Sequence, residues 1–208
     1  MTEAAPQGWV PVEHRFLGLD RRTFGAALSV LVIALVLLAG LPAVNALIPW
    51  HNEIRAGDVL DLGGGATAVP PVGWQLEDGA LTGSGSASPA SLQVQLATGG
   101  ATISLRGTAF TGTADAFLDQ VVRSEGSAGV DGPRGTVTTA SGLVGVALGS
   151  TSPQGDGLDV AFKMAGPAGQ AETAPALLVR VRTAPGQYER QQDVVGEFVR
   201  SITAGATR

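Results

Sequence analysis

The stretch SLQVQLATGGATISLR, residues 91–106, decides the fold of the larger part of this chain. On both sides of the pair Gly99-Gly100, aliphatic residues alternate with Gln, Thr, Ser and Arg; the aliphatic positions are Leu92, Val94, Leu96, Ile103 and Leu105. Because successive side chains of a strand point to opposite faces, this alternation predicts two paired strands with one buried and one solvated face. The glycine pair predicts a hairpin turn with positive φ angles.

Beyond the hairpin, the spacing of the apolar residues is that of a helix in some segments and that of a strand in others. Spacings of three or four predict an amphipathic helix over residues 113–125, with Thr113 as its N-cap, and a second over 187–202. Shorter apolar runs bounded by Gly, Pro and Ser predict further strands at residues 59–62, 68–76, 136–139, 143–148, 158–164 and 176–182. The sequence therefore predicts an α+β domain over residues 59–204, a mostly antiparallel sheet of six or seven strands covered by two helices on one face.

Residues 20–46, DRRTFGAALSVLVIALVLLAGLPAVNA, form a long apolar run, and no charged residue lies between Arg22 and His51. A bilayer core of roughly 30 Å requires about 20 helical residues. The run therefore predicts an N-terminal transmembrane helix over residues 23–49, with its outer end kinked or frayed at Pro42. We expect its membrane anchor residues to include Phe24, Leu31, Leu38 and the interfacial Trp50.

Charges on the two flanks of this helix predict its orientation. Residues 51–61 carry one arginine against three acids, whereas the N-terminal flank carries Arg15, Arg21 and Arg22. By the positive-inside rule, residues 1–22 are cytoplasmic and the domain is extracytoplasmic, joined to the helix by a polar tether at residues 50–58. We therefore expect a single-pass protein of the plasma membrane.

A cleaved export signal is the alternative interpretation of the same run. Arg21-Arg22-Thr23-Phe24 resembles a twin-arginine motif, and Val44-Asn45-Ala46 resembles a small-residue cleavage site. However, the apolar stretch is about twice as long as a typical signal core and is very rich in Leu, Val and Ile. The length favours an uncleaved anchor over cleavage after Ala46.

Composition excludes several classes of function. The 208-residue chain has a net charge of −5, so it lacks the basic surface that nucleic-acid binding requires. It contains no cysteine, which excludes disulfides, thiolate metal sites, a cysteine nucleophile and the lipidated cysteine of a bacterial lipoprotein. An extracytoplasmic domain without disulfides must be stabilised by its own core, for which about 150 residues suffice.

The usual catalytic bases are scarce in this sequence. The two histidines, His14 and His51, lie outside the predicted domain, so a Ser-His-Asp triad is excluded there. Lys163 is the single lysine of the chain, and no S-x-x-K motif precedes it. We interpret Lys163 as a solvated strand residue.

Two pairs of acids lie close in sequence, Glu77 with Asp78 and Asp156 with Asp159. Both pairs flank glycines, so they match turns better than a catalytic pair, and neither belongs to a calcium-loop pattern. We therefore expect no catalytic residues, no metal, no cofactor and no enzyme activity.

Three residues are candidates for contact with a ligand. Trp74 follows Pro70-Pro71 and Gly73, where a large ring either lines a pocket mouth or, in the interpretation we favour, fills the open end of the core. Arg180 and Arg182 occupy positions i and i+2 of a predicted strand and therefore share one face of the sheet.

The order of four features resembles the PsbP/Mog-type fold: Pro-x-Gly-Trp at residues 71–74, the hairpin, the helix with ADAFLDQVV at 114–122, and the last helix ending in FVRSI at 198–202. The resemblance spans residues 58–204. Single-domain envelope proteins of actinobacteria, such as the LpqN-like lipoproteins, share this fold. The resemblance implies an accessory, assembly or small-ligand-binding role without catalysis, although here a membrane helix takes the place of the lipidated cysteine.

These inferences predict a non-catalytic, membrane-anchored accessory or scaffold protein of the bacterial cell envelope that binds another membrane or envelope protein. The alternative is a binding or carrier domain for a small lipid-like ligand, with Trp74 near its opening. A deep apolar cavity between sheet and helices would favour the carrier, whereas a filled core with an exposed apolar patch would favour the scaffold.

Overall fold

The computed structural model describes most of the chain: residues 15–16, 19–20, 24–47, 52–84, 88–125, 130–165 and 171–205. The chain divides into two compact units, Met1–Trp50 and His51–Arg208. The first contains the apolar helix, and the second contains the α+β domain.

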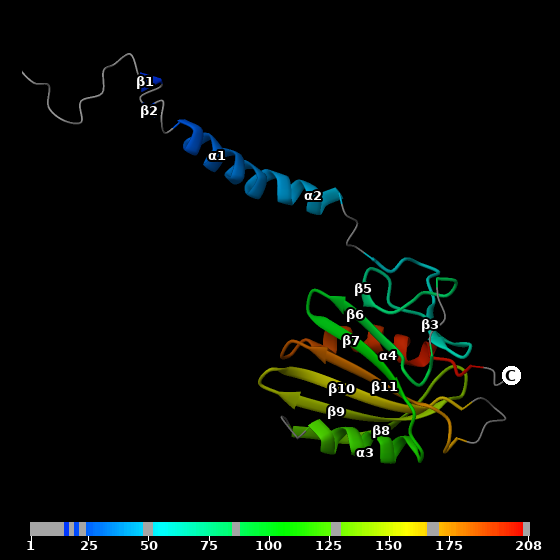
Figure 1. Ribbon diagram of the computed structural model, residues 1–208. Coiled ribbons are helices and arrows are strands. Elements are labelled where there is room, and N and C mark those ends of the chain that lie inside the picture. Colours follow the sequence, from blue (N-terminus) through cyan, green and yellow to red (C-terminus); the bar gives the residue numbers. More distant parts are fainter. Residues whose placement is uncertain are drawn as a thin grey trace, which may run out of the picture. The chain divides into compact units, whose positions relative to one another are not determined.

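In the N-terminal unit, a short strand pair precedes one continuous apolar helix (Figure 1). The elements are β1 (Arg15–Phe16), β2 (Leu19–Asp20), α1 (Phe24–Leu35), the π-helical turn η2 (Val36–Gly40) and α2 (Leu41–Leu47). The segment Gly25–Val44 is long and apolar enough to span a membrane, and no part of it is buried within the protein. This helix suits either a membrane anchor or an export signal.

The π-helical turn has a local cause in the sequence. Pro42 has no backbone N–H to donate to the carbonyl four residues before it, so regular α-helical bonding is interrupted there. Leu41 instead donates its N–H to Val36 O, five residues back. The proline therefore perturbs the turn that precedes it while the helix continues to Leu47.

Seven antiparallel strands form the sheet of the second unit, in the order β5-β6-β7-β11-β10-β9-β8 (Figure 1). The strands are β5 (Gln75–Asp78), β6 (Gln93–Thr98), β7 (Ala101–Thr108), β8 (Val130–Thr138), β9 (Val144–Ser152), β10 (Gly155–Lys163) and β11 (Ala176–Thr183). The other elements are a separate hairpin, β3 (Leu60–Gly63) and β4 (Ala66–Ala68), and the helices α3 (Ala114–Glu125) and α4 (Tyr188–Ser201). The predicted α+β class and antiparallel sheet are confirmed.

The hairpin β6–β7 has the predicted register but not the predicted turn. Val94 pairs with Leu105 on the buried face, and the polar positions between the aliphatic ones point to the other face. Neither Gly99 nor Gly100 has a positive φ, so the expected left-handed turn is wrong. Gly100 donates its N–H to Thr98 O at 2.6 Å. A Cβ on Gly100 would lie 2.7 Å from Gln187 Oε1, so a side chain at this position would displace the end of the Gln187 side chain.

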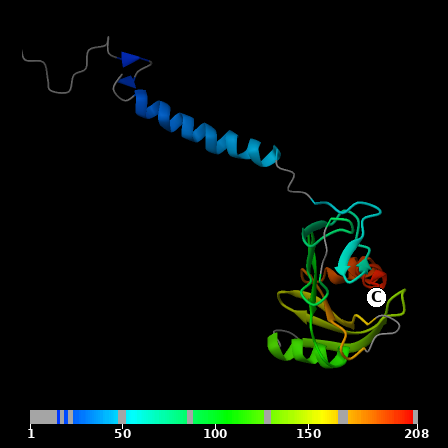
Figure 2. The same ribbon diagram turned by 45° about the vertical axis from the view of Figure 1, so that its right-hand side comes forward.

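The two helices of the domain lie on opposite faces of the sheet, which corrects the expectation that both cover one face (Figure 2). Phe198 of α4 shares a core with Val179 of β11. Leu118 of α3 shares a second core with Leu178, the next residue of that strand. Neighbouring strand residues point to opposite faces, so the two cores lie on opposite sides of β11. Helical periodicity identifies the buried side of a helix but not the face it covers, which explains the error.

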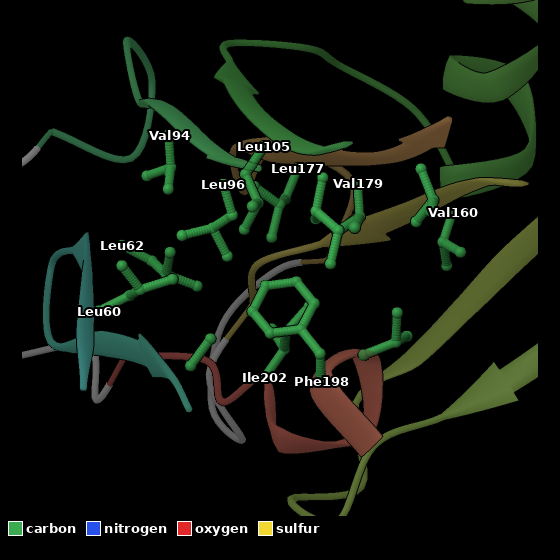
Figure 3. Packing of buried hydrophobic residues seen from close by; sticks show 14 of the residues in the cluster. Leu60, Leu62, Val94, Leu96, Leu105, Val160, Leu177, Val179, Phe198 and Ile202 are labelled. Carbon is green, nitrogen blue, oxygen red and sulfur yellow. The ribbon is translucent and has the colours of Figure 1, made fainter. Parts of the chain in front are cut away.

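The larger core lies between α4 and the sheet, and the hairpin β3–β4 closes one end of it. Leu60 and Leu62 of β3 lie in this core with Ile202, just beyond α4 (Figure 3). Figure 3 shows the ring of Phe198 pointing from α4 into the centre of this cluster. These side chains are buried, and the space between α4 and the sheet is therefore occupied by the protein's own residues.

The polar tether is shorter than the sequence suggested, because the domain already includes Asn52. Leu76 donates its N–H to Asn52 O at 2.8 Å, and Ile54 donates its N–H to Trp74 O at 2.8 Å. The side chain of Ile54 is buried in the larger core. In the sequence, Ile54 is a single apolar residue among polar neighbours, so no apolar periodicity indicated that this segment belongs to the domain. Trp50 and His51 lie outside the described residues.

Candidate functional site

Helix α3 covers only part of its side of the sheet. It packs on apolar residues of β9, β10 and β11, among them Leu148, Ala161 and Leu178. In the described part of the chain, no helix covers the neighbouring polar area. We call this area the open face; its residues are Gln93 and Gln95 of β6, Thr102, Ser104 and Arg106 of β7, Asp159 of β10, and Arg180 and Arg182 of β11.

The two candidate arginines meet on the open face at one carboxylate. Arg180 Nε donates to Asp159 Oδ1 at 3.1 Å, and Arg182 donates to both oxygens of Asp159, at 2.8 and 3.1 Å. Asp159 is buried, so two guanidinium groups surround a carboxylate that is shielded from water. A Cβ on Gly157 would lie 2.7 Å from Arg182 Nη1, so this strand glycine makes room for the guanidinium. The pair of arginines is thereby held in a fixed position.

A shallow pocket of about 210 Å³ lies beside this cluster on the open face. Its lining includes Asp78, Gln93, Gln95, Ser104, Arg106 and Arg180. Glu77 accepts a hydrogen bond from the Gln95 side chain at its rim. These groups offer hydrogen-bond donors and acceptors on a rigid sheet, which suits contact with another polar surface. They include no nucleophile held against a general base.

Trp74 and the arginines lie on opposite sides of the sheet. The ring of Trp74 is 5% exposed and belongs to the larger core on the α4 side. It therefore fills space at the end of that core, whereas Arg180 and Arg182 point to the α3 side. The structure does not bring the three candidates together, and a ligand-binding role for any of them stays a prediction.

Three of the predicted anchor residues, Phe24, Leu31 and Leu38, belong to the apolar helix. Leu31 is 62% exposed and Leu38 is 80% exposed, so neither is covered by the protein. Phe24 begins α1, and Trp50 lies outside the described residues.

Lys163 is buried, which corrects its interpretation as a solvated strand residue. It is 7% exposed and lies 5.4 Å from the centre of the Phe110 ring. Its ammonium donates to Phe110 O at 2.5 Å and to Glu172 O at 3.2 Å. Burial lowers the pKa of Lys163. Lys163 thus joins the loop before α3 to the loop before β11, and the error arose because its carbonyl partners are distant in sequence.

The structure does not bring the acids Asp156 and Asp159 together. Asp156 accepts a hydrogen bond from the N–H of Gly186 at 2.9 Å, whereas Asp159 binds the arginines on the other face of β10. Asp78 accepts a hydrogen bond from the N–H of Gly79 at 2.8 Å. Among the described residues, no three His, Cys, Asp or Glu side chains are grouped so that they could hold a metal ion.

A groove on the α4 side was not predicted from the sequence. It has a volume of about 530 Å³ and lies between the first turn of α4 and the strands β8, β9 and β10. Tyr188, the only tyrosine of the chain, lines it together with Gly149. The one available signal was the frequency of glycine in β8 and β9, because Gly132 and Gly149 belong to the lining of the groove.

Comparison with known proteins gives similarity to solved structures only. No protein-family model matches the sequence, and no curated protein matches it. Among solved structures, the chain is similar to the solution structure of cyanobacterial PsbP (CyanoP) from Synechocystis sp. PCC 6803, with a TM-score of 0.44 and 15% sequence identity. The match covers 68% of this chain and 87% of that chain. An LpqN-like identity and an actinobacterial origin stay predictions, and the function is inferred from the residues of this chain.

Proposed function

We propose that the protein is a non-catalytic, membrane-anchored accessory protein of the bacterial cell envelope whose extracytoplasmic domain binds another membrane or envelope protein. The observation that carries this proposal is the helix segment Gly25–Val44, which is apolar all round and is not buried by any part of the protein. In water such a surface requires a cover, and a bilayer is the cover that its length fits.

The filled core supports an accessory protein over a carrier of a lipid-like ligand. A carrier needs an apolar cavity that can enclose an acyl chain or ring system. In this domain, buried side chains such as Phe198, Leu177 and Ile202 occupy the space beneath the body of α4, and the groove at its first turn is open to solvent rather than enclosed. The ring of Trp74, which would have marked the opening of a carrier, lies in the same core.

The open face is the surface that we propose contacts the partner. It is polar rather than apolar, unlike the patch that a scaffold was expected to expose. Its arginines are already held by Asp159, so little side-chain entropy is lost when a partner binds them. Arg106 is exposed beside them, and arginine is enriched in protein interfaces.

A pull-down from native membranes tests this proposal. The bait is the full-length tagged protein in mild detergent, compared with Arg106→Glu on the open face and with Arg190→Glu on the exposed side of α4. We expect one membrane or envelope protein to be captured in stoichiometric amount by the wild type and by Arg190→Glu, and to be lost with Arg106→Glu.

Two results would contradict the proposal. Equal capture by Arg106→Glu would exclude the open face as the contact surface. A soluble bait whose intact mass corresponds to cleavage after Ala46 would exclude the membrane anchor.

A further inference from the structure

The groove on the α4 side has the size and lining of a small-molecule site. Its volume of about 530 Å³ falls within the range of about 300–1,000 Å³ that is usual for ligand pockets. Strand backbone and Leu158 form its floor, Pro133 of β8 forms one side, and the first turn of α4 forms the other. The N–H of Gly186 donates a hydrogen bond to Asp156, which ties the start of α4 to β10 and fixes this side of the groove on its floor.

Gly149 explains why the groove is open. A Cβ on this residue would meet only Gly157 O, at 4.0 Å, and its φ is not in the left-handed region. Neither packing nor backbone conformation therefore requires glycine here, although glycine in a strand is destabilising. A side chain at this position would project from β9 on the side that bears Leu158 of its partner β10, and would fill the groove. Close approach of a ligand to the backbone accounts for a glycine that the fold does not need.

The charges that line the groove are of one sign. Asp156 lies at one end and Glu189 in the first turn of α4, and the lining includes no lysine or arginine. Neither acid forms an ion pair with another described residue. The Tyr188 ring is half-buried at the same place, and burial raises the pKa of its hydroxyl, which keeps it a neutral hydrogen-bonding group.

We propose that this groove binds a small organic cation, an amine or guanidinium carried on an apolar or aromatic body. The apolar body lies on the bare backbone of Gly149 and on Leu158, Pro133 and the Tyr188 ring, while the cationic group lies near Asp156 and Glu189. The inference goes beyond the proposed function and does not rest on it, because the groove and the open face lie on opposite sides of the sheet.

Fluorine NMR at Tyr188 provides a direct test, since the single tyrosine gives a single signal when it is replaced by 3-fluorotyrosine. The full-length protein in nanodiscs is titrated with tryptamine, a cation, and with indole-3-propionate, an anion of similar size. We expect a saturable shift of the signal with tryptamine and none with indole-3-propionate.

Two variants and one control locate the site. Gly149→Val fills the floor, and it should weaken tryptamine binding by about tenfold or more while its unfolding temperature stays at or above that of the wild type. Glu189→Gln on the exposed helix turn should also weaken binding without affecting the fold. Gly135→Val is the control, because its Cβ also enters open space on β8 and this residue does not line the groove.

Three results would overturn the inference. The absence of a saturable shift with tryptamine would show that the groove is not a site for this class. Equal or tighter binding of indole-3-propionate would show that the charge is assigned wrongly. An unchanged tryptamine affinity in both Gly149→Val and Glu189→Gln would place binding elsewhere.

Discussion

The two faces of the seven-stranded sheet are used differently, and strand β11 shows the difference within eight residues. On the α4 side, Leu177, Val179 and Val181 are completely enclosed by the larger core. On the other side, Leu178 is covered by α3, whereas Arg180 and Arg182 belong to the open face. The same strand therefore stabilises the domain with one set of alternate residues and presents a polar surface with the other. Substitutions on the two sides should separate stability from binding.

The largest expected effect is on the enclosed face. Phe198→Ala removes a ring from the centre of the larger core, and we expect the free energy of unfolding to fall by about 3–5 kcal/mol. Urea unfolding of the full-length protein in detergent, followed by tryptophan fluorescence, measures this change. Val194→Ala on the exposed part of the same helix is the control and should cost less than about 1 kcal/mol. Similar losses for both variants would contradict the role of Phe198 in the core.

On the α3 side, the corresponding substitution should cost less. Leu118→Ala empties a position in the smaller core, whose rim includes partly buried residues that can move into the space. We therefore expect a loss of about 2–3 kcal/mol. The same urea unfolding measures it. A loss as large as that of Phe198→Ala would show that both faces contribute equally to the stability of the domain.

Local rules predicted most elements of this domain, but residues 68–76 do not form the single strand that was expected, because β4 ends at Ala68 and β5 begins at Gln75. The alternation in residues 91–106 identified β6, β7 and their buried face, because strand geometry alone decides which residues share a side. Thr113 was identified as the cap of α3, and its Oγ1 accepts the N–H of Ala116 at 3.2 Å. The side of the sheet that α3 covers could not be predicted, since it depends on how the chain crosses from β7 to β8.

Lys163 shows how a distant contact changes the role of a polar residue, and its replacement should have a moderate effect. Lys163→Met keeps the length of the side chain but removes the ammonium donor from the carbonyls of Phe110 and Glu172, of which Glu172 O still accepts the N–H of Gly112. We expect the free energy of unfolding at pH 7 to fall by about 1–2 kcal/mol. Urea unfolding measures the fall, and an unchanged stability would contradict the role of Lys163 in joining the two loops.

The pH dependence of the Lys163→Met effect follows from the lowered pKa of Lys163. Between that lowered pKa and the ordinary value of 10.5, the unfolded chain binds more protons than the folded protein. The stability of the wild type therefore gains from this group as the pH rises toward 10.5, and the variant lacks the gain. The difference between the two proteins should widen over this window, and a constant difference would contradict the burial of a charged ammonium.

The candidate sites were only partly predictable. Arg180 and Arg182 were placed on one face because they are two residues apart in a strand, but their shared partner Asp159 required the register of β10 against β11. The groove beside Tyr188 depends on three strands and a helix that are far apart in sequence. No local pattern could assemble it, and only the unexplained glycines of β8 and β9 pointed to it.

The smallest expected effect on stability is on the open face. Arg106 is exposed, and it forms no ion pair with another described residue. Arg106→Ala should therefore change the free energy of unfolding by no more than about 0.5 kcal/mol. The same variant should reduce capture of the membrane or envelope partner in the pull-down, because it removes a long donor from the proposed contact surface. A stable variant with reduced capture would separate binding from folding on this face, whereas full capture would mean that the open face is only a solvated side of the sheet.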